Sequence, residues 1–532
     1  MSAVSDTGNS GSTGGFFGHP KGLSTLFFTE MWERFSFYGL RPLLVLFMAA
    51  AVMQGGWGWD RGEASAIVGI YASFVYLASL PGGWIADKWL GLRRAVLYGG
   101  ALISLGHITI GASAFIHSKV PFFLGLVFIV LGTGLLKPNI SAMVGDLYPE
   151  GGARKDAGFS IFYMGINLGA LIGQLITGFL GESIGWHWGF TAAGVAMILG
   201  LIQFWIQSPK TLGDIGSEPT RHPDPVVQAK QVRMVKTSTI IGLVILASVF
   251  VMIATGTIPF VASTFGTYYA YFLAGIGFVY FAYLLLLGGL NSDEKKRVLV
   301  IAVLFVFAAI FWSAFEQTPT ALNLFAQDFT ERQLGSFLIP ATWFQSVNSA
   351  WIILLAPVIA AIWTGLGSRN INLSSPVKFA IGLGFAALSF VVMIFASYIV
   401  VGDGSVATKV SPLWLITFYL FLTLGELFVS PVGLSSMTTL SPKRYVGQMM
   451  GIWFLASSLG NLIGGLVGGD VDPDNLSAMP RLFTTTTLFL GGAALILLIL
   501  SVPIARMMRE RHPDTPPEDP IAEVPDTLPE EK

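Results

Sequence analysis

The sequence contains no cysteine and few charged residues. Without cysteine, a disulfide framework, a thiolate metal site and a cysteine nucleophile are all excluded. Charged residues make up 11% of the chain, whereas ordinary soluble proteins have about 25%. Neither an H-E-x-x-H zinc pair nor a G-x-x-x-x-G-K-[ST] phosphate loop occurs, so a zinc enzyme and an ATP-driven pump lack their signatures. The net charge of −1 gives no indication of nucleic-acid binding.

Apolar residues dominate the 532-residue chain. They make up 53% of it, and the mean hydropathy is +0.68, which predicts a multi-pass membrane protein. Windows of about 20 apolar residues predict fourteen membrane spans. The predicted spans are 24–52, 63–87, 93–115, 120–147, 156–181, 186–208, 237–257, 265–288, 298–327, 337–366, 376–401, 412–439, 444–468 and 480–506.

The spans fall into a group of six, a pair and a second group of six. Two six-helix bundles around a cavity would suit a transporter that rocks between two states. The inserted pair carries no charged residue over 237–288 and is predicted to be peripheral. The predicted units are a disordered leader (1–20, not a signal peptide), an N-terminal bundle (21–208), a cytoplasmic linker (209–236), an inserted hairpin (237–292), a C-terminal bundle (293–511) and a disordered acidic tail (512–532).

The distribution of positive charge predicts the orientation. Fourteen spans put both termini on one side of the membrane. Of the 30 Lys and Arg residues, 22 fall on that side, five on the other and three within spans. Because cytoplasmic loops are enriched in Lys and Arg, both termini are predicted to be cytoplasmic.

Four ionisable residues interrupt the first span. Glu30, Glu33, Arg34 and Arg41 lie in a stretch long enough to cross the bilayer, where each costs about 3 kcal/mol on insertion scales. Together with Tyr38, they fall within about 140° of one helix face, at roughly 100° per residue. Such a face is predicted to line a polar interior. A buried ion-pair network that only holds helices together is the alternative interpretation.

The loop between the second and third spans reads G-G-W-I-A-D-K-W-L-G-L-R-R, from Gly82 to Arg94. It resembles the signature loop of the major facilitator superfamily, in which an aspartate meets basic partners. The resemblance implies a cytoplasmic latch formed by Asp87, Arg93 and Arg94. An ordinary charged turn is the alternative.

Four further motifs occur in one order along the chain. They are E-M-W-E-R-F-S-F-Y-G from Glu30, G-T-G-L-L-K-P-N from Gly132, F-Y-M-G-I-N-L-G-A-L from Phe162 and G-E-L-F-V-S-P-V-G from Gly425. Together they resemble the motifs of the proton-dependent oligopeptide transporter family, in its bacterial type with two extra helices. Two residues depart from the family pattern, Phe37 in place of a tyrosine and Ala170 in place of a serine.

The resemblance implies a site for the two charged ends of a peptide. Arg41 and Lys137 of the first half would bind the peptide carboxylate, and Glu426 of the second half would bind its amino group. Intramembrane charges are expected to face such a cavity. In the empty cavity, Arg41 is predicted to pair with Glu316 and Lys137 with Glu426, because an unpaired buried charge is costly. Further peptide-binding residues implied by the family are Tyr38, Tyr76, Asn167, Trp312, Asn348, Ser430 and Trp453. As alternatives, the two tryptophans could be packing aromatics, and Tyr76 and Asn348 could make interhelical hydrogen bonds.

Carboxylates are the predicted proton carriers. His107 is the histidine that lies well inside a span, and we interpret it as a packed side chain. Glu30, Glu33 and Glu316 therefore remain, with Arg34 beside the first two. A carboxyl group changes its affinity for protons when its charged partner moves.

Two outer charges are predicted to form a gate between the bundles. Arg61 begins the second span and Asp328 follows the first span of the C-terminal bundle. An Arg61–Asp328 ion pair would hold the outside closed. Two unrelated solvated charges are the alternative.

The predicted function is import of di- and tripeptides with protons by alternating access, across the plasma membrane of a bacterium. The alternative keeps the fold and carries nitrate or another small anion with protons. The protein would be a secondary transporter and not an enzyme, with no cofactor, no metal and no nucleic-acid partner. It would contact the lipid bilayer and function as a monomer.

Overall fold

The computed structural model describes the whole chain except residues 1–14, 117, 370–372, 403–407 and 510–532. Fifteen α-helices and one two-stranded hairpin are present in the described part. The elements are α1 (Lys21–Ala49), α2 (Arg61–Ile85), α3 (Leu92–Ile116), α4 (Lys119–Asp146), α5 (Gly152–Phe179), α6 (Trp186–Thr211), α7 (Pro225–Ala254), α8 (Ala262–Leu287), α9 (Ser292–Phe315), α10 (Asn323–Phe329), β1 (Gln333–Leu334), β2 (Phe337–Leu338), α11 (Trp343–Gly367), α12 (Ser375–Val401), α13 (Leu413–Thr439), α14 (Val446–Leu466) and α15 (Ala478–Arg509).

Thirteen helical segments of the described residues are long and apolar enough to cross a membrane. The 29-residue α1 is also long enough, although it contains the charged residues noted above. Because lipid offers no hydrogen-bond partners, the backbone of each span satisfies its own N–H and C=O groups as a helix. The predicted all-helical membrane fold is confirmed.

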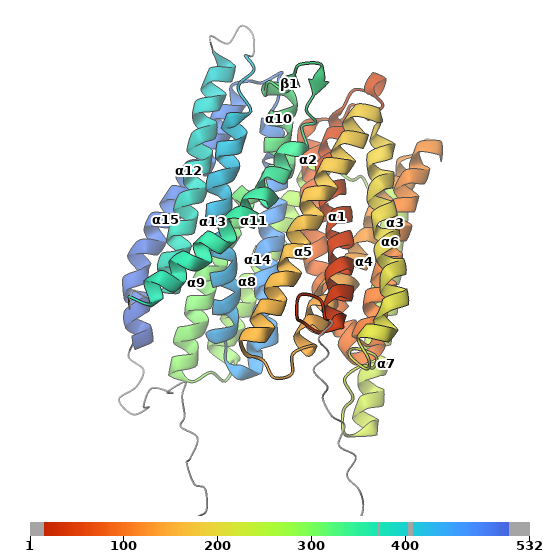
Figure 1. The fold of residues 1–532 in the computed structure, drawn as a ribbon, viewed down its shortest axis with the longest axis vertical. Helices are drawn as coiled ribbons and strands as arrows, with labels where there is room; N and C mark the ends of the chain where they lie inside the picture. The colour runs from red at the N-terminus through yellow and green to blue at the C-terminus, as the bar shows by residue number, and fades with distance from the viewer. Residues whose placement is uncertain (1–14, 117, 370–372, 403–407, 510–532) are drawn as a thin grey trace, which may run out of the picture.

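The helices form two bundles, and the pair α7 and α8 lies between them in the sequence. Figure 1 shows α1–α6 on one side and α9–α15 on the other. The sequence predicts a peripheral pair, and α7 is peripheral, because no residue of its most apolar window is buried. In contrast, α8 contacts α2 of the first bundle and α14 and α9 of the second. The helix α7 begins at Pro225, within the stretch predicted as the linker.

Irregular turns interrupt several spans. The chain leaves the α-helical conformation at Glu316 and continues in a π-helical turn, Thr318–Leu322, before α10. This turn contains Pro319, which has no N–H to donate. Pro138 and Pro431 lie inside α4 and α13. The break therefore occurs where the span carries its carboxylate.

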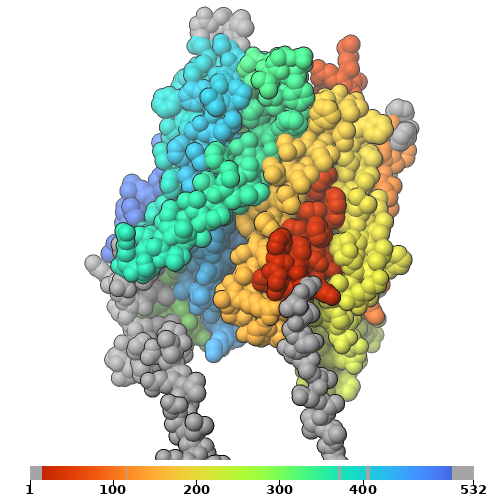
Figure 2. All heavy atoms as spheres, viewed as in Figure 1, coloured from red at the N-terminus to blue at the C-terminus, as the bar shows by residue number. Residues whose placement is uncertain are grey.

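The two bundles approach most closely toward one end of the molecule. We call this the upper end: it lies at the top of Figure 1, where α1 ends and α2 begins, and the opposite end is the lower end. A Cβ on Gly69 of α2 would lie 2.8 Å from Cα of Gly465 of α14, so these two backbones touch. Toward the lower end, Figure 2 shows α5 and α11 separating on the visible face. The cavity between the bundles is therefore closed above.

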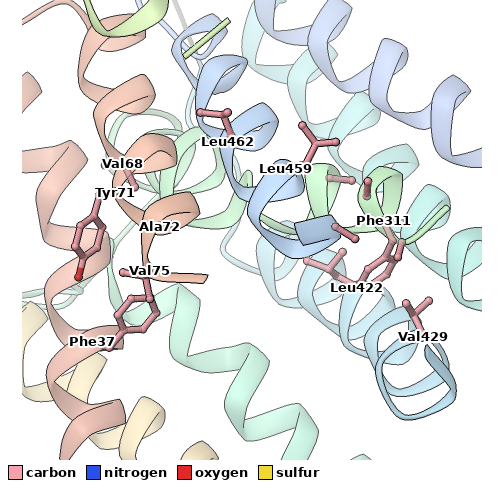
Figure 3. Packing of buried hydrophobic residues seen from close by; sticks show 14 of the residues in the cluster. Phe37, Val68, Tyr71, Ala72, Val75, Phe311, Leu422, Val429, Leu459 and Leu462 are labelled. Carbon is pink, nitrogen blue, oxygen red and sulfur yellow. The ribbon is translucent and has the colours of Figure 1, made fainter. Parts of the chain in front are cut away.

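The hydrophobic core extends through both bundles. Figure 3 shows Phe37, Tyr71 and Val75 in the first bundle, and Phe311 and Leu422 in the second. All five belong to one cluster of buried residues. The polar site described next is embedded in this cluster.

The predicted leader and tail fall largely outside the described residues. Residues 1–14 and 510–532 are not described. Within the predicted leader, Phe16 and His19 are described and pair through their backbones just before α1.

Candidate functional site

The charged face of α1 is buried as a group. Glu30, Glu33 and Arg34 are each at most 3% exposed. Nε of Arg34 lies 2.8 Å from Oε1 of Glu30 and 2.6 Å from Oε2 of Glu33, so two carboxylates share one guanidinium. The Phe37 ring, which replaces the family's tyrosine, lies between two cations: Cζ of Arg34 is 5.7 Å and Cζ of Arg41 is 5.9 Å from its centroid.

Arg41 connects the two bundles. Its guanidinium forms an ion pair with Glu316, at the break after α9. It also donates a hydrogen bond of 2.9 Å to Oδ1 of Asn461 on α14. Because an unpaired charge at this depth would be strongly destabilising, the pair favours the arrangement in which the bundles meet here.

The ion pair borders a cavity of about 120 Å³ between the bundles. The N-terminal bundle supplies Tyr38, Arg41, Pro42, Tyr76, Tyr163, Ile166, Asn167, Ala170 and Gln174. The C-terminal bundle supplies Trp312, Phe315, Glu316, Thr318, Gln345, Asn348, Ser349, Ile352, Tyr419 and Glu426. No grouping of three or more His, Asp or Glu that could hold a metal occurs among the described residues.

Glu426 lies on the opposite wall from Arg41. Its Oε2 accepts a hydrogen bond of 3.1 Å from the Asn348 amide, which also donates to Thr423 at 2.9 Å. Asn167, across the cavity on α5, donates to the carbonyl of Tyr163 in its own helix. The cavity thus offers a carboxylate from one bundle and a guanidinium from the other.

Lys137 does not pair with Glu426, contrary to the expectation that each cation would neutralise a carboxylate of the other bundle. Its Nζ lies 3.9 Å from the ring centroid of Tyr76 on α2. The difference arises because α4 packs against α2 within its own bundle, so the nearest electron-rich group is an aromatic face. Tyr76 lines the cavity, whereas Lys137 is not among the lining residues.

Besides Lys137, two predicted binding residues do not line the described cavity, Trp453 and Ser430. Trp453 packs inside the C-terminal bundle, with its ring against Gly433 and 6.5 Å from the ring of Phe379. Ser430, on α13, is also absent from the cavity lining. Trp312, in contrast, lines the cavity and packs edge-on against Phe315. For Trp453, the packing interpretation fits the structure.

The predicted Arg61–Asp328 ion pair is present at the upper end. Nη1 of Arg61 lies 2.5 Å from Oδ2 of Asp328 and donates to the carbonyl of Val471 at 3.2 Å. Asp472 lies farther away, with Oδ1 3.8 Å from Nε of Arg61. Two segments of the C-terminal half, at Asp328 and at Val471–Asp472, thus meet one arginine of the N-terminal bundle.

A second upper contact was not predicted. Glu182, in the π-helical turn after α5, accepts hydrogen bonds from the backbone N–H groups of Ala341 and Thr342 at 2.7 and 2.9 Å. It also pairs with Arg332 at 3.3 Å. Burial lowers the pKa of Arg332, and the neighbouring Glu182 carboxylate opposes that effect. Residues 150 positions apart close the second flank of the upper end.

The predicted latch of Asp87 with Arg93 and Arg94 is wrong in its partners. Oδ1 of Asp87 accepts from the Thr220 hydroxyl at 2.6 Å, and Oδ2 lies 2.9 Å from Nζ of Lys88. Arg93 donates to backbone carbonyls of the linker, and Arg94 lines a surface pocket beside it. The sequence motif cannot show that the linker folds back over the loop, which is why the partners differ.

Comparison with known proteins decides the family. A sequence model of the POT family matches residues 93–474, more than half of the chain. The chain belongs to the POT family. The predicted relationship to the proton-dependent oligopeptide transporters is therefore confirmed.

Relatives of this POT family member resemble it over nearly their whole length. The peptide transporter YePEPT of Yersinia enterocolitica is 49% identical over 498 residues, which cover 93% of this chain and 96% of the relative. The di-/tripeptide transporter of Lactococcus lactis subsp. cremoris is 36% identical over 504 residues, covering 93% and 97%.

Solved structures agree with this fold. The peptide transporter POT in complex with sulfate is 40% identical, with a TM-score of 0.84 over 93% of this chain and 97% of that chain. A POT family transporter in complex with 5-aminolevulinic acid is 35% identical, with a TM-score of 0.81 over 92% and 98%.

Several cavity residues of this POT family chain escaped the sequence reasoning. Tyr163, Gln174 and Gln345 line the cavity, and Asn461 binds Arg41. Helical spacing gives the missing signal for three of them. Gln174 follows Asn167 by two turns, Gln345 precedes Asn348 by one turn, and Tyr163 precedes Asn167 by one turn.

Proposed function

We propose that this chain imports di- and tripeptides together with protons by alternating access. The carrying observation is that opposite charges lie on facing walls of one cavity. Arg41, which pairs with Glu316, lies on the wall of the N-terminal bundle, and Glu426, which accepts a bond from Asn348, lies on the wall of the C-terminal bundle. A peptide zwitterion matches both walls: its carboxylate would compete with Glu316 for Arg41, and its ammonium would pair with Glu426. The names of the relatives, peptide transporter and di-/tripeptide transporter, support this substrate.

Proton coupling would use the carboxylates of α1 and that of Glu316, at the break after α9. A proton on Glu316 would weaken its hold on Arg41 and free the guanidinium for the peptide carboxylate. Glu30 and Glu33 share Arg34 and offer a second protonation site in the same bundle. Protons would thus bias the contact between the bundles without any cofactor.

The nitrate alternative has less support. A small anion would have a partner in Arg41, but it would gain nothing from Glu426, which repels it. The relatives named above are peptide transporters. We therefore favour a cargo with a free amino group.

We further propose that the lower end is cytoplasmic, in the plasma membrane of a bacterium. The excess of Lys and Arg in the loops of that end supports this orientation. The cavity lies within a single chain, which supports a functional monomer. The upper ion pairs would then close the outer side.

Uptake by purified protein in proteoliposomes tests the proposal. An inward proton gradient should drive accumulation of radiolabelled alanyl-alanine above its equilibrium level. Unlabelled di- and tripeptides should compete, whereas nitrate should not. Competition by nitrate together with indifference to peptides would replace the peptide cargo with the anion.

A further inference from the structure

The inserted helix α8 is fixed to the N-terminal bundle by one carboxylate at its upper end. Glu63 of α2 accepts hydrogen bonds from the N–H groups of Ala262 and Ser263, at 2.7 and 3.2 Å, and from the Ser263 hydroxyl. These N–H groups belong to the first turn of α8, where a helix has no internal acceptors. A carboxylate is also favoured there by the helix dipole.

Along the rest of its length, α8 packs mainly on the C-terminal bundle. A Cβ on Gly266 would lie 2.8 Å from Leu466 of α14, and one on Gly277 would lie 3.0 Å from Phe305 of α9. At the lower end, the Tyr280 hydroxyl donates to Gln448 at 2.7 Å. The chain just after α8 is held as well, because Tyr445 donates to the carbonyl of Gly288 at 3.0 Å.

The contacts of α8 with the N-terminal bundle are made to α2. Besides the bonds that Glu63 accepts, the rings of Tyr269 and Phe74 stack with centroids 4.8 Å apart. Glu63 lies two residues after Arg61, which pairs with Asp328 of the opposite bundle. One short stretch of α2 therefore holds both the upper ion pair and the attachment to α8.

We infer that Glu63 is a positioning residue of the upper gate: it holds the start of α2 against α8 and so keeps Arg61 within reach of Asp328. Because α8 also packs on the C-terminal bundle, the upper ends of the bundles can part only by breaking the bonds of α8 to Glu63 or the packing of α8 on α14. The inserted hairpin thereby stabilises the arrangement that is closed above. This role rests on the proposed alternating access.

Distance measurement between spin labels tests this role directly. The chain has no native cysteine, so a Met53→Cys, Leu413→Cys double variant labels two exposed positions at the upper end, one in each half. In this background, Glu63→Gln should raise the fraction of long distances about tenfold, because it replaces charge-assisted hydrogen bonds with weaker neutral ones. Ser263→Ala removes one of these bonds and should have a smaller effect in the same direction.

Asp224→Asn is the matched control. Asp224 also caps a helix of the inserted pair, through a 2.8 Å bond from the Val226 N–H, but it does not join the bundles. It should leave the distances unchanged. An unchanged distance distribution in both Glu63→Gln and Ser263→Ala would overturn the inference, even if thermal stability fell. Failure of the parent protein to take up peptide would instead count against the proposed function, since the distances are measured without transport.

Discussion

Nζ of Lys137 lies 3.9 Å from the centre of the Tyr76 ring, so this cation is held by an aromatic face of its own bundle. No carboxylate oxygen of the described residues lies within 4.0 Å of it. Arg41, by contrast, is already neutralised by Glu316 across the cavity. A peptide carboxylate that reached Lys137 would therefore have no ion pair to break, whereas one that bound Arg41 would first have to displace Glu316.

Replacing Lys137 with alanine should lower gradient-driven uptake by about 100-fold, because a charge-assisted hydrogen bond can contribute about 3 kcal/mol. Initial rates would be measured in proteoliposomes at equal protein density. Tyr76→Phe keeps the aromatic ring and should retain most of the uptake. Near-normal accumulation by Lys137→Ala would remove this lysine from the mechanism.

The upper ion pair should matter less than the cavity charges. Arg61 and Asp328 are partly exposed, with 21% and 22% of their side chains accessible, and such pairs contribute about 1 kcal/mol at most. Arg61→Ala should therefore reduce peptide accumulation about fivefold. Asp472→Ala removes only the 3.8 Å contact and should have a smaller effect. Equal effects of the two substitutions would show that the Asp328 pair has no special role.

Glu426 should recognise the free amino group of the peptide. Glu426→Gln removes the charge and leaves an amide of the same size, so we expect affinity for alanyl-alanine to fall about tenfold or more. An N-acetylated dipeptide has no ammonium group and serves as the control substrate. Its weak binding should be unaffected by the substitution. A similar loss for both ligands would mean that Glu426 acts on the shape of the cavity and not on the amino group.

Much of the site could be predicted, because a charged residue within a membrane span must pair with another charge or face a polar interior. Glu30, Glu33, Arg34 and Arg41 share one helix face, and the structure buries them together as that spacing implies. Glu316 was paired with Arg41 by the same reasoning, since two buried charges of opposite sign stabilise each other. In these cases the relevant information is local, or it is limited to a handful of charges.

The remaining contacts depend on how distant segments meet. Glu182 and Arg332 are separated by 150 residues, and neither belongs to a recognisable motif. Asp87 binds the linker at Thr220, whose path over the loop has no periodic signature. Trp453 was assigned to the cavity by resemblance, yet its ring fills the space above Gly433. Side-chain direction across a bundle cannot be read from spacing within one helix.

The carboxylates of α1 allow a test that separates coupling from binding. Arg34 lies within 2.8 Å of one oxygen of Glu30 and 2.6 Å of one of Glu33, so a proton on either would leave the other paired. Glutamine keeps the size of glutamate but cannot titrate. We therefore expect Glu33→Gln to lose accumulation driven by a proton gradient, while the cavity charges that bind peptide remain in place.

Two assays on the same proteoliposomes measure this difference. Uphill uptake with an inward proton gradient should fall to the equilibrium level in Glu33→Gln. Counterflow of labelled peptide into liposomes preloaded with unlabelled peptide should persist, because exchange requires no net proton movement. If both Glu30→Gln and Glu33→Gln still concentrate dipeptide under the gradient, the charged face of α1 only holds helices together. Glu316 would then be the carboxylate that carries the proton, and Glu316→Gln should show the loss of uphill uptake with retained counterflow.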